Sequence, residues 1–515
     1  MNHSTDPAVR ALVAGVLWPG FLGTTAPDWL LRELDAGLAG AVYFGHNIDH
    51  DDEEQLPALS RRLSEARAGV LLGVDEEGGT VTRLEAAHGS TLPGAAQLGR
   101  VDDVDATRAV GAELARRVRA SGATVVLAPV ADVNTNPRNP VIGVRSFGSS
   151  AALVSRHVVA SVEGIQSGGV AACVKHFPGH GDTSVDSHHG LPRVELAPAE
   201  IESDHLPPFQ AAIDAGVAAV MTSHVVLPSF GELPATLNPR ILASLRERGF
   251  TGAIVTDALD MAAIRSEYGA GRGAVLALQA GADLLCIGNP SPLGPKRGTT
   301  DDLADYLEVR DALLGALDDG ALAVADLERA SGAVSALSEW VESRRAASVV
   351  ADGSGAGFDR AAGFDAARIV REAISVSGTV DLSERPLAVL DLRDRATIAV
   401  ASTADPFTAA LSAGNDCVRV GVGPLGGRDV VAVLADALAH VEQERTIVAL
   451  VDAVQPGSPQ RRAVGMLAAA RPGSVVVNAG LPGSEPLPLA TVDAFGVSRL
   501  TAEVVAGLLN GAMVA

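Results

Sequence analysis

Three cysteines are all that this 515-residue chain contains, at positions 173, 286 and 417. Each lies inside an apolar run, which is inconsistent with a disulfide framework and favours a protein that folds in a reducing compartment. Basic residues are also scarce, and the formal net charge is −22. This charge argues against a surface that binds nucleic acid or anionic membranes, because such a surface needs a basic face.

No segment has the pattern of a targeting sequence or a membrane span. The N-terminal stretch MNHSTDPAVRALVAGVLWPG lacks a basic region, and its apolar part is short and followed by Pro and Gly. No apolar run reaches the roughly 18 residues that a membrane span needs. With 47% hydrophobic and 20% charged residues, the composition is that of an ordinary globular protein. We therefore expect a cytoplasmic protein of two domains, since the chain is too long for one simple core.

The first 340 residues or so repeat one pattern: a short apolar run, a polar loop and an amphipathic helical stretch. The apolar runs lie at 11–18, 39–45, 69–75, 124–130, 170–175, 217–223, 252–257 and 282–288. Continuous apolar runs indicate strands that are covered on both faces, and hence a parallel sheet. The sequence predicts a (β/α)8 barrel of the TIM type over residues 1–341, with a doubly wound open sheet as the alternative.

Residues 342–364, ESRRAASVVADGSGAGFDRAAGF, lose this pattern and are rich in Gly, Ala and Ser, which predicts a linker. Over residues 365–515 the apolar runs PLAVLDL, TIAVAS, CVRVGVG, TIVALVDA and SVVVNAG alternate with helical stretches. This part of the chain predicts a smaller α/β sandwich domain. The glycines of GVGPLGG, at 421–427, follow a predicted strand, but such glycines are common in loops and do not by themselves indicate a nucleotide site.

Five of the predicted barrel strands end in side chains that can do chemistry. These are Asp75, Lys175 with His176, Ser223 with His224, Asp257, and the loop Asp132–Arg145. In barrels of this kind the carboxyl ends of the strands build the active site. The sequence therefore predicts a catalytic site at this rim.

Asp257 follows the buried run GFTGAIV and precedes ALDM, which opens a helix. An aspartate held at the barrel mouth suits attack on an electrophilic carbon or stabilisation of a cation. The alternative is that Asp257 caps a helix beginning near Leu259.

The stretch KHFPGHGDTSVDSHHG, residues 175–190, can be interpreted in three ways. A metal site would use His176, His180, Asp182, Asp186, His188 and His189. The sequence FPG interrupts the spacing between the first two histidines, however, and forbids a helix that places both on one face. A solvated polar loop explains the glycines but not Lys175, one of only two lysines in the chain.

The third interpretation, which we favour, is proton transfer. Asp186 and His188 are two residues apart, so both can lie on one face of an extended segment. A carboxylate that is hydrogen-bonded to an imidazole fixes the tautomer of the ring and stabilises its charged form. The pair can therefore act as a proton donor near neutral pH.

Six motifs occur in order: VDEEGGTVTRL, NPVIGVRSFG, KHFPGHGDTSVDSH, VMTSHV, PATL and GFTGAIVTDALDM. Together they resemble the β-N-acetylglucosaminidases of glycoside hydrolase family three, from about Gly23 to Gly288. The resemblance implies that Asp257 is a nucleophile and that His188, paired with Asp186, is the general acid/base on a mobile loop. It also implies that hydroxyl and acetamido groups of the sugar are held by Asp75, Arg83, Arg145, Lys175 and His176.

Three positions depart from the family pattern. The family often has Gln at Glu76, Arg at Thr80 and Ser at Thr256. These departures leave the catalytic pair intact and bear on the outer subsite.

The resemblance implies an enzyme without metal or cofactor that removes terminal β-GlcNAc from peptidoglycan- or chitin-derived oligosaccharides with retention of configuration. The alternative is a phosphorylase that uses inorganic phosphate and releases GlcNAc 1-phosphate, since a neutral histidine would not repel phosphate as a carboxylate does. A silent sugar-binding protein on the same fold is a further alternative, against which the intact Asp257, Asp186 and His188 argue. No nucleic-acid or membrane partner is expected.

Overall fold

The computed structural model describes residues 5–185, 190–291, 301–353, 364–380, 382, 385–393, 404–423 and 425–511. The chain divides into two compact units. The first comprises Met1–Glu77, Val104–Thr135 and Ser149–Phe364, and the second comprises Gly78–Asp103, Asn136–Gly148 and Asp365–Ala515.

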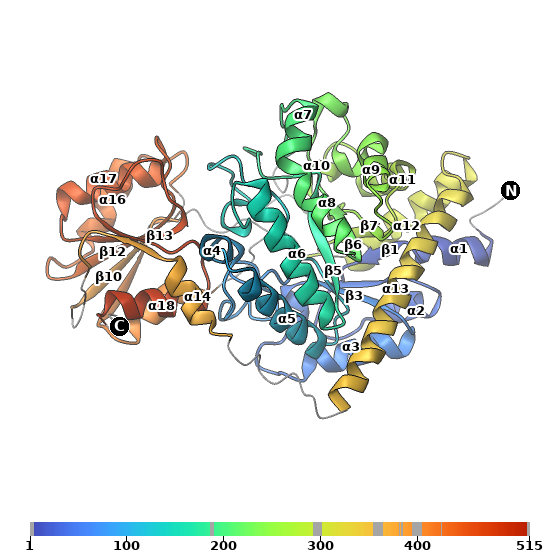
Figure 1. The fold of residues 1–515 in the computed structure, drawn as a ribbon, viewed down its shortest axis with the longest axis horizontal. Helices are drawn as coiled ribbons and strands as arrows, with labels where there is room; N and C mark the ends of the chain where they lie inside the picture. The colour runs from blue at the N-terminus through green and yellow to red at the C-terminus, as the bar shows by residue number, and fades with distance from the viewer. Residues whose placement is uncertain are drawn as a thin grey trace. The chain divides into compact units, whose positions relative to one another are not determined.

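Eight parallel strands form the centre of the first unit (Figure 1). Six pair side by side in chain order: β2 (Gly40–Tyr43), β3 (Leu71–Val74), β4 (Val125–Val126), β5 (Ala171–Phe177), β6 (Ala219–Thr222) and β7 (Ala253–Val255). The other two, β1 (Leu17–Pro19) and β8 (Leu285–Gly288), pair with each other. Parallel bridges join Gly20 to Val42 and Val255 to Leu284, so the β1–β8 pair closes the sheet at both edges. The predicted (β/α)8 barrel is therefore confirmed, and the open-sheet alternative is wrong.

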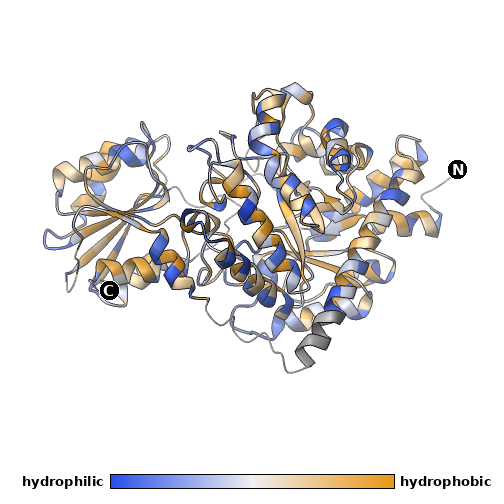
Figure 2. Ribbon diagram, viewed as in Figure 1, coloured by the Kyte–Doolittle hydropathy of each residue, from blue (hydrophilic) through white to orange (hydrophobic). Residues whose placement is uncertain are grey.

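The barrel core is continuous because every strand contributes a buried side chain to it. These side chains are Trp18, Val42, Leu71, Val125, Cys173, Met221, Val255 and Cys286. Gly73 of β3 leaves room for the largest of them, since a Cβ at this position would lie 2.3 Å from the Trp18 ring. Figure 2 shows the strands mostly in the hydrophobic colour, as expected for strands buried on both faces.

Helices surround this barrel, and their residues alternate between buried and exposed positions (Figures 1 and 2). The longer ones are α1 (Pro7–Ala14), α2 (Asp28–Asp35), α3 (Gln55–Ala66), α5 (Val104–Ala120), α6 (Ala151–Ser167), α8 (Pro207–Asp214), α9 (Pro239–Glu247), α11 (Ala270–Ala280), α12 (Asp302–Asp318) and α13 (Val324–Gly353). Short helical turns are η2 (Gly45–Asn47), α7 (Pro198–Glu200), η4 (Ile201–His205), η5 (Pro228–Phe230), η6 (Ala235–Leu237) and α10 (Ala262–Arg265). Asp6, Asn238 and Asp301 cap the helices that follow them by accepting a backbone N–H.

Two elements of the first unit differ from the sequence prediction. The apolar run 11–18 was expected to be a strand, but its first residues complete α1, and β1 begins at Leu17. The Asp6 cap and Pro7 at the first helical position start that helix, and they outweigh the apolar run. Helix α13 continues to Gly353, so the first part of the predicted linker 342–364 is helical. Its alanines, glutamate and arginines are good helix formers, whereas residues 354–363 lie outside the described residues.

The second unit contains a six-stranded sheet between two layers of helices. The strand order is β11 (Cys417–Gly421), β10 (Leu387–Asp391), β12 (Thr446–Ala453), β13 (Val475–Leu481), β14 (Ala490–Asp493) and β9 (Ser375–Ser377). All neighbours are parallel except β14 and β9. Helices α16 (Val430–Ala439) and α17 (Pro459–Ala470) cover one face, and α14 (Ala366–Ala373), α15 (Pro406–Ser412) and α18 (Arg499–Leu509) contribute to the opposite side. The predicted α/β sandwich is thus confirmed; the predicted strand TIAVAS lies outside the described residues.

Two segments that precede the sandwich in the chain also belong to the second unit. Segment 78–103 contains α4 (Ala95–Val101), and segment 136–148 contains η3 (Gly143–Arg145). Gln97 of α4 is completely buried, and its Nε2 donates hydrogen bonds to Ala494 O at 2.8 Å and Thr501 Oγ1 at 2.9 Å. Arg100 donates to Ala373 O and stacks over the Phe495 ring. Residues far apart in sequence therefore share one core.

In the part of the chain that the structure describes, no helix combines the length and the apolar character needed to cross a bilayer.

Candidate active site

Asp257 lies directly after β7, in a turn that is fixed to β8 by backbone hydrogen bonds. Thr256 N donates to Leu284 O at 3.0 Å, and Leu259 N donates to Cys286 O at 2.9 Å. The Thr256 hydroxyl accepts the Cys286 N–H at 2.9 Å. Asp257 Oδ1 accepts the N–H of the next residue, Ala258, at 2.8 Å. The carboxylate is therefore half-buried and held on a rigid turn.

The helix that follows does not use Asp257 as its cap. Helix α10 begins at Ala262 with Met261 at the N-cap position. The alternative interpretation of Asp257 as an N-cap is therefore wrong. A carboxylate that is half-buried but does not cap a helix fits a role in chemistry better than a role in helix termination.

Lys175, near the end of β5, forms a buried ion pair with two carboxylates that follow β3. Its Nζ lies 2.7 Å from Asp75 Oδ1 and 2.7 Å from Glu77 Oε1. Only 3% of the lysine side chain is exposed, compared with 22% for Asp75. Burial of an ammonium is costly unless it is paired, and here two anions compensate one cation. The structure thus brings together the predicted residues Asp75 and Lys175.

Glu77 was missed by the sequence analysis as a member of this site. The signal was present, because Glu77 lies two residues after Asp75 in VDEEGG. Side chains two residues apart in an extended segment lie on the same face. The same rule that paired Asp186 with His188 would have paired these two carboxylates.

His176 is held by Asp132, the first residue of the predicted rim loop. His176 Nδ1 lies 2.7 Å from Asp132 Oδ2, and the His180 backbone N–H donates to Asp132 Oδ1 at 2.7 Å. Burial raises the pKa of Asp132, but the charge and hydrogen bond of His176 and the neighbouring His180 outweigh it, so the pKa is lowered overall. An ionised Asp132 orients the His176 ring and places its proton on Nδ1.

His180 is buried beside this pair and stays neutral. Burial lowers the pKa of His180 to about 4, more than the Asp132 charge raises it. Its Nδ1 lies 2.8 Å from Thr183 Oγ1. Gly181 passes close to the chain that carries Asp132, because a Cβ on Gly181 would lie 1.8 Å from Val133 O. These contacts fix the start of the histidine-rich loop.

The predicted acid/base pair, Asp186 and His188, lies outside the described residues, which resume at Gly190. The described ends of the loop are both anchored. Thr183 Oγ1 contacts His180, and Val194 N donates to Val226 O at 3.0 Å. The roles of Asp186 and His188 remain predictions.

Three of the six side chains in the metal interpretation of this loop lie within the described residues. Across residues 5–185, 190–291 and the later described ranges, no three His, Cys, Asp or Glu side chains group in a way that could hold a metal ion. Asp182 accepts a hydrogen bond from Thr135 Oγ1 at 2.9 Å. The other proposed ligands Asp186, His188 and His189 lie outside those ranges.

Arg83 and Arg145, which were predicted to bind the sugar, belong to the second unit, whereas Asp75, Lys175, His176 and Asp257 belong to the first. Both arginines are buried, and Arg145 donates to Val141 O at 3.0 Å. Thr80, which stands where the family often has Arg, accepts a hydrogen bond from Val497 N at 3.3 Å. Sugar binding by the two arginines stays a prediction.

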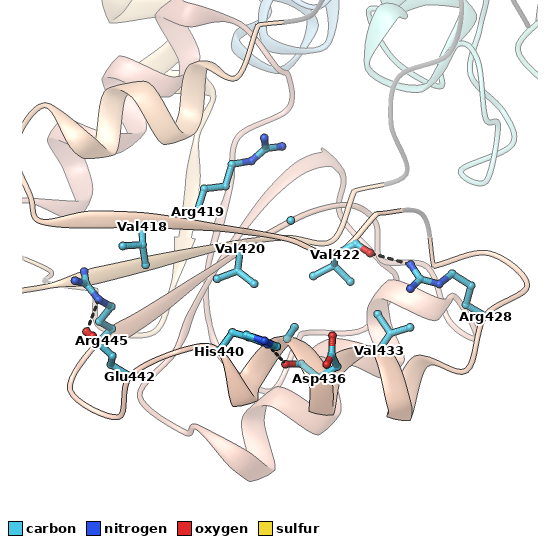
Figure 3. Close-up of a pocket in the computed structure, with 12 residues that line it drawn as sticks. Val418, Arg419, Val420, Val422, Arg428, Val433, Asp436, His440, Glu442 and Arg445 are labelled. Atoms are coloured by element: carbon cyan, nitrogen blue, oxygen red, sulfur yellow. Dashed lines mark hydrogen bonds and ion pairs between the residues drawn. The ribbon is translucent and has the colours of Figure 1, made fainter.

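A pocket in the second unit lies between β11 and α16 and contains none of the predicted site residues (Figure 3). Val420 of β11 and Val433 of α16 are among the residues that line it. Two of its arginines are engaged in local contacts: Arg445 with Glu442, and Arg428 with the Val422 carbonyl. We therefore assign the chemistry to the barrel rim.

A closed (β/α)8 barrel with a carboxylate, a buried lysine and an aspartate-bound histidine at its carboxyl rim has the architecture of a barrel enzyme. The family model described as Glycosyl hydrolase family 3 N terminal domain matches residues 30–331. The chain belongs to glycosyl hydrolase family 3, and the resemblance inferred from its motifs is confirmed.

Three relatives illustrate this membership. The structure of a glycoside hydrolase family 3 β-N-acetylglucosaminidase from Paenibacillus sp. str. FPU-7 is similar with a TM-score of 0.81 and 30% identity, over 98% of this chain and 97% of that one. β-Hexosaminidase A of Pseudoalteromonas piscicida is 33% identical over 55% of this chain, a match that spans about half (52%) of that protein. β-Hexosaminidase LpqI of Mycobacterium tuberculosis is 35% identical over 48% of this chain and 68% of its own length.

Proposed function

We propose that the protein is a retaining β-N-acetylglucosaminidase that removes terminal β-GlcNAc from peptidoglycan- or chitin-derived oligosaccharides. The observation that carries the proposal is the Asp257 carboxylate, which is half-buried and fixed on the turn after β7. It is supported by the similarity to a β-N-acetylglucosaminidase structure and to β-hexosaminidases. A cytoplasmic location, expected from the cysteine content, would suit the recycling of wall fragments.

The proposed reaction has two steps. In the first, an oxygen of Asp257 attacks C1 of the sugar, the bond from C1 to the leaving oxygen breaks, and His188 donates its proton to that oxygen. In the second, His188 removes a proton from water, the water oxygen bonds to C1, and the bond to Asp257 breaks. Asp186 would hold the His188 imidazole and stabilise its charged form. Two inversions at C1 give net retention.

Binding of the sugar is assigned to the remaining rim residues. The Asp75 carboxylate is paired with Lys175 and is proposed to accept hydrogen bonds from sugar hydroxyls. Asp132 accepts the Nδ1–H of His176 and so orients the ring, whose Nε2 is proposed to contact a sugar hydroxyl. Arg83 and Arg145 are proposed to complete the contacts with the hydroxyl and acetamido groups.

The test is a rate measurement on 4-nitrophenyl β-GlcNAc with and without millimolar phosphate, with identification of the sugar product and of its first-formed anomer by NMR. Free β-GlcNAc at a rate indifferent to phosphate is expected. GlcNAc 1-phosphate, with a rate that rises with phosphate, would identify a phosphorylase instead. An α-anomer would contradict retention, and an absence of turnover would favour a silent sugar-binding protein.

A further inference from the structure

His224 follows β6 and is completely buried next to the turn that carries Asp257. Its Nε2 lies 2.9 Å from the carbonyl oxygen of Ala258, and its Nδ1 lies 2.9 Å from Thr236 Oγ1. Both ring nitrogens therefore have partners within hydrogen-bond distance. One of these partners is the residue that immediately follows the proposed nucleophile.

The partners determine where the proton of His224 lies. A carbonyl oxygen only accepts, so Nε2 must carry the hydrogen and donate it to Ala258 O. In the neutral ring Nδ1 is then an acceptor for the Thr236 hydroxyl. That hydroxyl is also placed to donate to Ser223 O at 2.9 Å, which receives the Thr236 backbone N–H at 3.1 Å as well. Ser223 O and Nδ1 are therefore alternative acceptors for the single hydroxyl hydrogen.

A second threonine completes this chain of hydrogen bonds. Thr222 Oγ1 lies 2.8 Å from Thr236 Oγ1, and both side chains are completely buried. Either threonine hydroxyl can be the donor in this contact. Consecutive hydrogen-bond contacts thus link Thr222, Thr236, His224 and the Ala258 carbonyl. Buried groups that satisfy one another in this way hold a single arrangement of the polypeptide.

Hydrogen bonds hold both the N–H and the carbonyl group of Ala258. Its N–H donates to Asp257 Oδ1 at 2.8 Å, and its carbonyl receives the His224 proton at 2.9 Å. A shift of the Ala258 carbonyl would rotate the adjoining backbone and move the N–H that holds the carboxylate. The fixed position of Asp257 therefore depends on His224 as well as on the hydrogen bonds to β8.

We infer that His224 is a positioning residue for Asp257, which acts through the Ala258 carbonyl and does not take part in proton transfer. The inference rests on the proposed role of Asp257 as nucleophile. A nucleophile must lie close to its line of attack, and a displacement of about 1 Å can lower the rate by roughly 100-fold. Loss of the His224 contact is therefore expected to lower kcat and to leave KM nearly unchanged.

The test compares two replacements of His224 with a matched control. His224→Leu removes both hydrogen bonds, whereas His224→Gln retains an amide N–H near the position of Nε2. The control is His157→Leu, because His157 is equally buried and its Nδ1 also bonds a threonine, Thr107 Oγ1 at 2.8 Å, but it lies between α5 and α6. Pre-steady-state release of 4-nitrophenol from 4-nitrophenyl β-GlcNAc measures formation of the glycosyl-enzyme in each variant.

We expect His224→Leu to slow glycosyl-enzyme formation by about 10- to 100-fold, with KM within a factor of about three. His224→Gln should recover most of this loss, and His157→Leu should retain the wild-type rate at a temperature where it is folded. Equal losses in the two leucine variants, or no loss in His224→Leu, would overturn the inference. If His224→Leu does not fold, His224→Gln is compared with Thr236→Val, which removes the hydroxyl that orients the ring. Slower glycosyl-enzyme formation in His224→Gln than in Thr236→Val would then overturn the inference.

Asp257→Ala separates this inference from the proposed function. If Asp257→Ala retains turnover, the nucleophile assignment fails, whatever His224 does. If Asp257→Ala is inactive while His224→Leu is fully active, only the positioning role fails.

Discussion

Lys175 Nζ lies 2.7 Å from Asp75 Oδ1, although the two residues are 100 positions apart in the chain, with Asp75 directly after β3 and Lys175 in β5. The contact joins the carboxyl ends of β3 and β5. A second carboxylate, Glu77, lies at the same distance from the ammonium. The pair is buried enough that neither charge could be removed without leaving the other in a site from which water is largely excluded.

Replacement of Lys175 should therefore cost both stability and activity. We expect Lys175→Met to lower the free energy of unfolding by about 3–5 kcal/mol, because it leaves two partly buried carboxylates without their cation. Urea unfolding measures the loss, and the activity of the folded fraction should fall as well. A Lys175→Met variant as stable as the wild type would show that the carboxylates are neutral or hydrated.

Replacement of Asp257 should affect activity alone. Its carboxylate is half-buried, and the oxygen of Asn can still accept the Ala258 N–H. We expect Asp257→Asn to reduce kcat by at least about 1,000-fold and to change the melting temperature by no more than a few degrees. Substantial remaining turnover, measured on freshly purified protein to exclude deamidation, would remove Asp257 from the mechanism.

Acid should destabilise the protein through the buried His180. Burial lowers the pKa of His180 from 6.5 to about 4, so between these values the unfolded chain binds a proton that the folded protein does not. The free energy of unfolding must therefore fall as the pH falls from about 6.5 to 4, by roughly 3 kcal/mol for this group. Urea titrations at several pH values across this range should show that the free energy of unfolding changes less with pH in His180→Gln than in the wild type. Equal changes with pH would contradict a neutral buried His180.

The two glycines at either end of the histidine-rich loop provide a matched test of packing. A Cβ on Gly181 would lie 1.8 Å from Val133 O, whereas the nearest atom to a Cβ on Gly190 is a Val185 methyl carbon at 3.8 Å. We expect Gly181→Ala to cost about 1–3 kcal/mol and to disturb the neighbouring Asp132, while Gly190→Ala is tolerated. Thermal unfolding and turnover of both variants measure the difference. A tolerated Gly181→Ala would show that the Val133 backbone moves freely.

The barrel was predictable because its strands are buried on both faces and so leave continuous apolar runs in the sequence. The prediction of a strand over 11–18 was wrong in its first part for a local reason. Asp6 caps and Pro7 begins a helix, which the apolar composition of this run does not reveal. The predicted linker was judged by its composition, which does not distinguish an alanine-rich helix such as the end of α13 from a flexible segment.

The sequence could predict which strand ends carry the residues of the candidate site, but not which of these residues contact one another. Nothing in the sequence shows that Lys175 meets Asp75 and Glu77, or that Asp132 holds His176, because these contacts depend on strand order and register. The role of His224 was equally hidden, since its partners Thr236 and Ala258 are brought to it by loops after different strands. Proximity across a barrel follows from its closure and not from spacing along the chain.

The division of the chain into units bears on how the sandwich domain can be exchanged between proteins. Segments 78–103 and 136–148 share the core of the second unit, and Gln97 is bonded to residues near the C-terminus. A chimera joined at residue 364 would combine a foreign C-terminal domain with segments 78–103 and 136–148 of this chain, which do not match that domain. The buried Gln97 amide would then lose its hydrogen-bond acceptors. Transplantation would succeed only if segments 78–103 and 136–148 were transferred together with the domain. Substitutions in the C-terminal region are therefore expected to be coupled to substitutions in these two segments.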